Sequence, residues 1–196
     1  ALQAGVDPQT IYFHGNNKSR AELEEAIAAN CTIVADNWLE LQTLAELATN
    51  QSPRVMLRIT PGIECHTHEY IRTGHLDSKF GFDPNQVAEV LNFLVKTPNL
   101  DFVGVHAHIG SQIFEQQPHQ DLGGVLVDWL KTAQGLGLPA RELNVGGGLG
   151  IRYTEADDPP SIEEWTATVA QAVEAACQEA QVSPPKLICE PGRSLV

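Results

Sequence analysis

Polar side chains recur at alternate positions near the ends of several short apolar runs. Successive residues of a strand point to opposite faces, so in residues 102–108 Val103 and Val105 would face one side and the histidines the other. The same alternation in four further runs places a set of polar residues on one face: His14, Asp36, Arg58, His106, His108 and Glu190. Imidazole, carboxylate and guanidinium groups gathered at strand ends can bind charged ligands and transfer protons.

Two further motifs are suited to binding an anion. Residues 144–150 place three consecutive glycines directly after an expected strand, and glycine lets the backbone approach a phosphate and offer its N–H groups. A tight turn that needs positive φ angles would use the same residues. Residues 190–193 combine a carboxylate, a rigid turn and an arginine, which could clamp an anion or form only a surface ion pair.

The elements that must position these residues alternate between strands and helices. The expected strands are 11–14, 32–36, 55–59, 102–108, 142–145 and 186–190. Helix starts are indicated by capping pairs at Ser19 with Glu22 and Ser161 with Glu164, and by Asp83 before a proline. Such alternation predicts an α/β fold with a parallel sheet, open or closed into a barrel. In a barrel the polar set would converge at the carboxyl ends of the strands.

Apolar residues at helical spacing indicate four helix faces that pack on the sheet. They are Leu23, Ala26 and Ile27; Val87, Val90, Leu91 and Leu94; Leu122, Val125, Leu126 and Trp129; and Ile162, Trp165, Val169 and Val173. Residues 60–82 are long and poor in helix signals, which suggests a functional insertion. Residues 154–161, rich in aspartate and proline, are expected to form a surface loop.

Composition excludes several classes of partner. The chain has 196 residues, 42% of them hydrophobic, which is enough for one core. A net charge of −13 argues against nucleic acid and anionic membranes as partners. There is no run of about 18 apolar residues and no signal-peptide pattern, and the four cysteines are scattered. We therefore expect a cytoplasmic protein.

Seven motifs, in the same order along the chain, resemble segments of diaminopimelate decarboxylases. They are HGNNKS at 14–19, RITPGI at 58–63, HTHEYI-x-TG at 66–74, DSKFGF at 77–82, HAHIGSQ at 106–112, NVGGG at 144–148 and EPGR at 190–193. The stretch 66–82 separates this family from the ornithine decarboxylases. The resemblance implies a pyridoxal 5′-phosphate (PLP) enzyme that converts meso-diaminopimelate to L-lysine and CO₂. It also implies a TIM-type (β/α)₈ barrel followed by a β-domain, in a homodimer.

The resemblance also implies roles for individual residues. Glu190 resembles the acid that pairs with the pyridinium nitrogen of PLP, and His108 resembles the histidine that stacks on its ring; these two would be catalytic. Positions that resemble the phosphate cradle are Ser111, Gly148, Gly192 and Arg193. Arg193 also matches the residue that meets the substrate carboxylate, and Asp36 and Arg58 match residues close to the cofactor.

The sequence departs from the family pattern at both ends. The family's Schiff-base lysine lies in a YAxKA-like segment on the first barrel strand, and Lys18 and Lys79 lie in other motifs. We therefore expect residues 1–196 to form an incomplete PLP-binding barrel, with about six of eight βα units and without the β-domain. Such a chain by itself would be inactive, and its open sheet edges would make it marginally stable.

Three alternatives remain open. One is a related basic amino-acid decarboxylase of the same barrel family, and another is a truncated PLP barrel without catalytic activity. The third is a metal-dependent hydrolase, in which His106 with His108, or His66 with His68, would offer two imidazoles on one strand face. That hydrolase needs further ligands at later strand ends, where the sequence has Asn144 to Gly148 and Glu190 to Arg193, so we expect no metal.

Overall fold

The described part of the chain is built around one parallel sheet. A computed structural model describes residues 1–63 and 80–196, and in this part six parallel strands pair in the order β1-β2-β3-β4-β5-β6. The strands are β1 (Tyr12–Phe13), β2 (Thr32–Ala35), β3 (Arg54–Arg58), β4 (Asp101–His106), β5 (Glu142–Asn144) and β6 (Lys186–Ile188). The helices are α1 (Arg20–Ala28), α2 (Trp38–Leu47), α3 (Pro84–Val95), α4 (Gln117–Gly135) and α5 (Ile162–Ala180).

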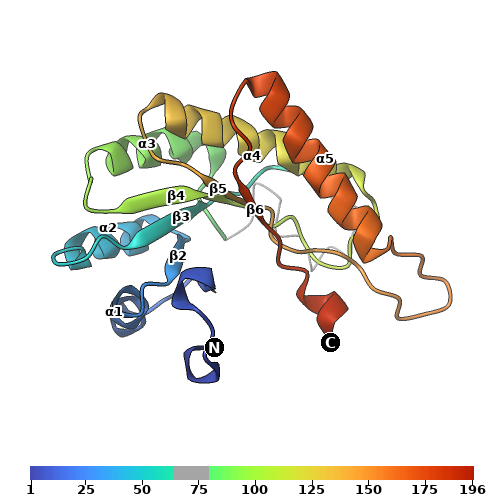
Figure 1. The fold of residues 1–196 in the computed structure, drawn as a ribbon, viewed down its shortest axis with the longest axis horizontal. Coiled ribbons are helices and arrows are strands. Elements are labelled where there is room, and N and C mark those ends of the chain that lie inside the picture. The colour runs from blue at the N-terminus through green and yellow to red at the C-terminus, as the bar shows by residue number, and fades with distance from the viewer. Residues whose placement is uncertain (64–79) are drawn as a thin grey trace.

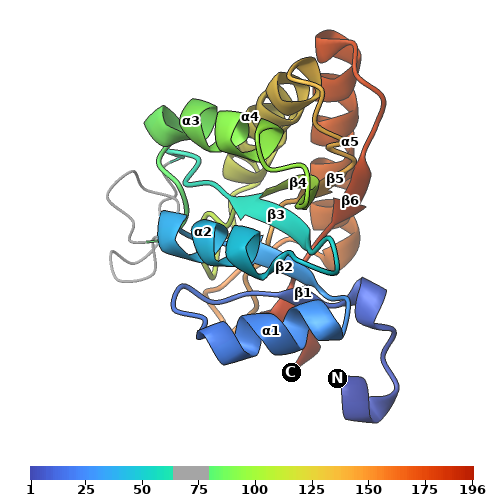
Figure 2. The same cartoon turned by 90° about the vertical axis from the view of Figure 1, so that its left-hand side faces the viewer.

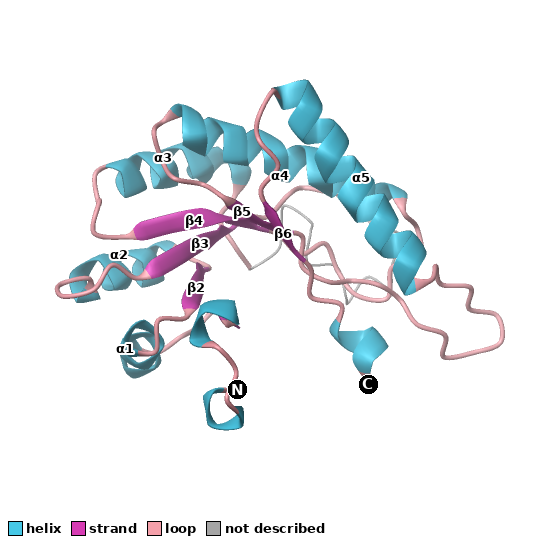
Figure 3. Ribbon diagram, viewed as in Figure 1, coloured by secondary structure: helices cyan, strands magenta, loops and turns pink. Residues whose placement is uncertain are grey.

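The helices form an outer arc around a curved sheet (Figure 1). Turning the molecule shows the same arrangement, with α1 and α2 beside the first strands and α4 and α5 beside the last (Figure 2). Each strand is followed by a helix on the outer side until β6 (Figure 3). This half-barrel confirms the predicted α/β fold with six strands. Every helix in residues 1–63 and 80–196 is too short or too polar to span a lipid bilayer.

Local signals placed the six strands and four of the five α-helices of the described residues; α2 was not among the expected helices. Each of the six expected strands is present, with ends that differ by at most two residues. Ser19 and Ser161 accept hydrogen bonds in complete capping boxes, and Asp83 caps α3 in the same way with Gln86. The expected helix faces are mostly buried, but Ile162 is 48% exposed. That part of the prediction was wrong because Ile162 is the first residue of α5, where the helix extends beyond the sheet.

Strand parity holds except at one irregular position. Val55, Leu57 and Ile59 pack in the main core against the helices, as predicted. Val103 instead packs with Val34 and Met56 in a small cluster on the inner face. The prediction that it shares the outer face with Val105 was wrong, because the register between β3 and β4 shifts at this point. A bulge of this kind reverses the alternation of side chains.

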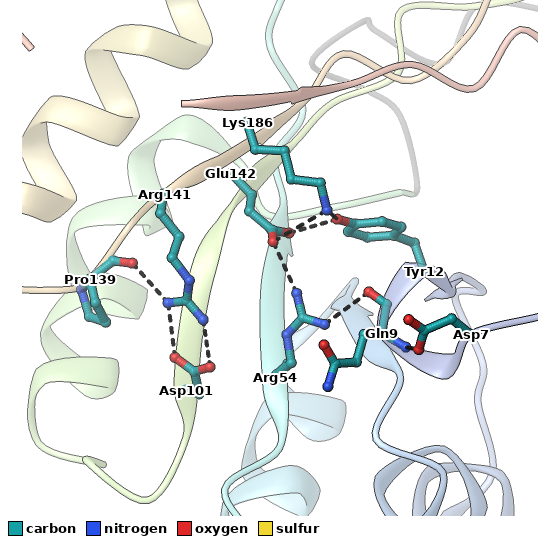
Figure 4. Close-up of polar contacts among 9 residues, drawn as sticks. All are labelled: Asp7, Gln9, Tyr12, Arg54, Asp101, Pro139, Arg141, Glu142 and Lys186. Carbon is teal, nitrogen blue, oxygen red and sulfur yellow. Dashed lines mark hydrogen bonds and ion pairs between the residues drawn. The ribbon is translucent and has the colours of Figure 1, made fainter. Parts of the chain in front are cut away.

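The two ends of the sheet carry different polar groups. Tyr12, Arg54, Glu142 and Lys186 are each the first residue of their strand, and they form a network on the inner face (Figure 4). The Tyr12 hydroxyl lies 2.7 Å from Glu142 Oε2 and 3.0 Å from Lys186 Nζ, and Arg54 lies 3.0 Å from Glu142 Oε1. The predicted site residues lie at the opposite end, where the strands finish.

Candidate functional site

A cavity of about 550 Å³ opens beyond the carboxyl ends of β4, β5 and β6. Its lining contains six of the eight predicted site residues: His108, Ser111, Gly148, Glu190, Gly192 and Arg193. The other lining residues are Gln112, Leu149, Ile151, Tyr153 and Val196. These segments are distant in the sequence, and they meet because parallel strands all end at the same edge of the sheet.

Asp36 and Arg58 lie outside this lining. Arg58 Nη1 is 3.3 Å from Asp36 Oδ1, and both side chains are largely buried. The Arg58 guanidinium also lies over the Phe80 ring, 4.8 Å from its centroid. Arg58 is close enough to Glu190 for the two charges to interact. The pair therefore borders the site, and a direct contact with a cofactor stays a prediction.

Glu190 is an ionised carboxylate at the cavity wall. Its Oε1 lies 2.7 Å from His14 Nε2 and 2.9 Å from Asn144 Nδ2. Burial raises the pKa of the Glu190 carboxyl, but hydrogen bonds from His14 and Asn144 and the electrostatic effect of His14 and His106 together outweigh burial and lower the pKa to about 2. A carboxylate with this pKa is an anion throughout the neutral range, so it can pair with a protonated ring nitrogen.

His108 lies at the cavity wall as a neutral imidazole. Burial, and then the charge of Arg58, lowers the pKa of His108 to about 4. The Gly147 N–H donates to His108 Nδ1 at 3.4 Å, which places the ring proton on Nε2. A neutral, flat ring with a fixed tautomer can stack on an aromatic ligand without repelling a positive charge on it.

The triple-glycine loop is shaped partly by packing. A Cβ on Gly147 would lie 2.2 Å from the Glu190 carbonyl oxygen, and one on Gly146 would lie 2.7 Å from Ala107 O. These two glycines therefore allow the loop to pack against its neighbours, as the turn interpretation requires. Gly148, with φ +108°, is the one that lines the cavity. Among the described residues its N–H donates to no acceptor, so it is available to an anion.

Two residues of the cavity were missed by the sequence reasoning. Tyr153 accepts a hydrogen bond from Arg193 Nη1, and the guanidinium lies 5.7 Å from the centre of its ring. Gln112 donates to Ile151 O at 2.6 Å and accepts from Ile151 N at 3.2 Å, which ties two cavity loops together. Both contacts join residues about 40 positions apart. The sequence carries no spacing signal for such contacts.

The possible metal ligands in the structure differ from the predicted histidine pairs and share only His106 with them. Among the described residues, His14, His106 and Glu190 offer ligand atoms within 4.8 Å of one another. Zinc ligands at about 2.0 Å from the ion lie roughly 3.3 Å apart in a tetrahedron, whereas His14 and Glu190 are separated by 2.7 Å. That spacing is a hydrogen bond. His66 and His68 lie outside the described residues, as do Lys79 and most of the expected insertion.

Comparison with known proteins identifies the family. The model of the pyridoxal-dependent decarboxylase, pyridoxal binding domain, matches residues 1–196. The chain belongs to this family. Its cofactor is accordingly PLP, as the motifs predicted.

Similar proteins are diaminopimelate decarboxylases. The chain is 64% identical over 190 residues to the enzyme of Synechocystis sp. (96% of the chain, 40% of the relative), and 42% identical over 205 residues to that of Halalkalibacterium halodurans (100% and 46%). It matches the crystal structure of the Helicobacter pylori enzyme complexed with L-lysine at TM-score 0.90 and 32% identity, covering 100% of the chain and 48% of that structure. The chain thus spans less than half the length of these relatives.

The residues of the cavity fit PLP. Glu190 offers an anion to the ring nitrogen, His108 offers a neutral ring, and Arg193 offers a cation to the phosphate. A Cβ on Gly192 would meet no protein atom within 4 Å, so protein packing does not require a glycine there and a ligand has room to approach. Lys18 is held by Glu40 at 2.8 Å and does not line the cavity.

Proposed function

We propose that this chain supplies the cofactor-binding barrel of a diaminopimelate decarboxylase, which converts meso-2,6-diaminopimelate to L-lysine and CO₂. One observation carries the proposal: six residues predicted from the family motifs line a single cavity, and the acid among them is ionised. The identity of 64% to the Synechocystis sp. enzyme supports the choice of substrate.

Bound PLP supplies an electron-withdrawing ring that stabilises the negative charge left on the substrate when CO₂ departs. Because Glu190 stays ionised at neutral pH, its negative charge would stabilise the protonated form of the ring nitrogen. His108 would cover one face of the ring and exclude water from it. Glu190 and His108 would each contact the ring that withdraws electrons from the substrate, and we therefore assign both of them catalytic roles.

The remaining lining residues bind and orient. The Gly148 N–H and the Ser111 hydroxyl would bind the phosphate, Gly192 would leave room for it, and Arg193 would add a positive charge. Arg193 is also assigned to the substrate carboxylate. Arg193 is exposed, and its side chain makes a hydrogen bond and a ring contact with Tyr153, another residue of the cavity lining.

The experiment uses the full gene product with PLP and meso-diaminopimelate, and measures L-lysine and CO₂. Replacing Glu190 with glutamine should lower kcat about 100-fold, the usual loss when one charge-stabilising group is removed. Replacing Arg193 with alanine should mainly raise KM. Glu89, an exposed glutamate on α3, provides the matched control, since E89Q should retain full activity.

Two outcomes would contradict the proposal. Full turnover by E190Q would remove the assignment of Glu190 to the ring nitrogen. Turnover of L-arginine or L-ornithine in place of meso-diaminopimelate would favour the related basic amino-acid decarboxylases instead.

The wider setting is also part of the proposal. The enzyme would act in the cytoplasm as a homodimer, without nucleic-acid or membrane partners, in agreement with the family resemblance and the net charge of −13. No lysine of residues 1–63 or 80–196 lines the cavity. The lysine that binds the cofactor covalently would therefore come from outside the described residues.

A further inference from the structure

The two hydrogen bonds to Glu190 engage the same carboxylate oxygen. His14 Nε2 lies 2.7 Å from Glu190 Oε1, and Asn144 Nδ2 lies 2.9 Å from the same atom. Within residues 1–63 and 80–196, Oε2 accepts no hydrogen bond, and its one ion-pair partner is His106 Nε2, at 3.8 Å, which is beyond hydrogen-bond distance. The carboxylate is therefore held by one oxygen and offers the other.

The two donors come from different parts of the sheet. His14 directly follows β1, one edge strand, and Asn144 is the last residue of β5. Glu190 follows β6, the other edge strand. A glutamate side chain has three rotatable bonds, and a single hydrogen bond leaves much of that freedom. Two donors from two directions fix both the position and the plane of the carboxylate.

The His14 ring is itself braced. The buried ring of His106 meets it edge to face, with centroids 4.8 Å apart and planes at 66°. Asn144 is held by a hydrogen bond, because its Oδ1 accepts the Gly146 N–H at 2.9 Å. Each donor therefore has a fixed orientation before any ligand arrives, which is the arrangement a pre-organised site requires.

We propose that His14 is a positioning residue, which holds Glu190 through Oε1 so that Oε2 accepts the ring N–H of the cofactor. This inference rests on the proposed function, since it assumes that Glu190 pairs with the ring nitrogen. His14 does not line the cavity, so it acts through Glu190 alone. Removing it leaves the glutamate in place but frees the rotation of its carboxylate.

The test measures binding of two probes to the apo form of the full gene product. Pyridoxine 5′-phosphate has the ring nitrogen but no aldehyde, so it binds without a covalent bond. Its 1-deaza analogue carries C–H in place of that nitrogen. The ratio of the two Kd values reports the contact with the ring nitrogen separately from the phosphate and stacking contacts.

Replacing His14 with alanine should reduce this ratio about tenfold, which corresponds to the loss of one charge-assisted hydrogen bond. Replacing it with glutamine should recover part of the ratio, because the side-chain amide can donate to Oε1. Tyr12 provides the matched control: Y12F also removes a polar contact made by β1, but at the opposite end of the sheet, and should leave the ratio unchanged.

The outcomes separate the two levels of inference. If E190Q leaves the ratio unchanged, the proposed function of Glu190 fails. If E190Q abolishes it and H14A does not change it, the role of His14 is wrong. Equal weakening of both probes by H14A would show a merely structural role and would also overturn the inference.

A spectroscopic readout covers the case in which H14A does not fold. The ¹⁵N shift of the ring nitrogen in bound pyridoxine 5′-phosphate should be that of a protonated ring in the wild type and in H14Q. A neutral ring nitrogen in the folded wild type would contradict the assignment of Glu190, on which the inference about His14 rests, whereas a neutral ring nitrogen in H14Q alone would contradict the expected recovery by glutamine.

Discussion

The network at the amino-terminal end of the sheet should contribute strongly to stability, and replacing Glu142 with alanine tests this. The carboxylate of Glu142 receives hydrogen bonds from Arg54 and Tyr12, with Lys186 at 3.7 Å from it (Figure 4). Only 7% of its side chain is exposed, and 15% of that of Arg54. The alanine variant therefore leaves a buried guanidinium without its carboxylate.

The size of the effect follows from burial. Removing one partner of a buried ion pair destabilises a protein by about 3–5 kcal/mol, because the remaining charge is uncompensated. The same end of the sheet offers an internal control in the pair of Arg141 and Asp101, which are 48% and 31% exposed. Exposed pairs contribute roughly 0–1 kcal/mol, so D101N should cost little.

The assay is equilibrium unfolding of the full gene product in urea, followed by tryptophan fluorescence. E142A should lower the free energy of unfolding by about 3 kcal/mol or more, and D101N by less than about 1 kcal/mol. A double-mutant cycle between Tyr12 and Glu142 should give a positive coupling energy, since their hydroxyl and carboxylate are 2.7 Å apart. Equal effects of E142A and D101N would refute the reasoning that burial sets the magnitude.

Three further predictions follow from packing and charge. A Cβ on Gly104 would lie 1.8 Å from the Glu142 carbonyl oxygen, so G104A should destabilise the fold by about 3 kcal/mol in the same urea assay. G124A is the control and should be neutral or stabilising, because a Cβ on Gly124 of α4 would meet no atom within 4 Å. Burial lowers the pKa of His119 to about 4; the unfolded chain therefore takes up a proton first, and stability should fall as the pH drops from about 6.5 to 4. The H119F variant should lose part of that pH dependence; an unchanged slope would contradict the assignment. The 196-residue polypeptide alone should aggregate, because within the described residues β1 and β6 each pair with a neighbour on one side only; a sharp, reversible thermal transition of a monomer would count against this.

The sequence by itself predicted the six strands, four of the helices and six residues that line one cavity. Capping pairs such as Ser19 with Glu22 act within one turn, so they are legible without the fold. The alternation of side chains along a strand is a local property of the backbone, and it predicted that His108 and Glu190 point to the face that carries the cavity. The family motifs added the identity of the cofactor. Parity failed at Val103, where a register shift between two strands breaks the alternation.

Only the tertiary structure decided which groups touch. The hydrogen bond between His14 and Glu190 joins residues 176 positions apart, and that between Tyr12 and Glu142 spans 130. Both contacts form because the sheet curves and brings the inner faces of distant strands together. No local pattern encodes that curvature, because it follows from the twist of all the strands and the packing of helices outside them. The sequence therefore identified the chemical groups, and the curvature of the sheet determined the hydrogen bonds and the lowered pKa of Glu190.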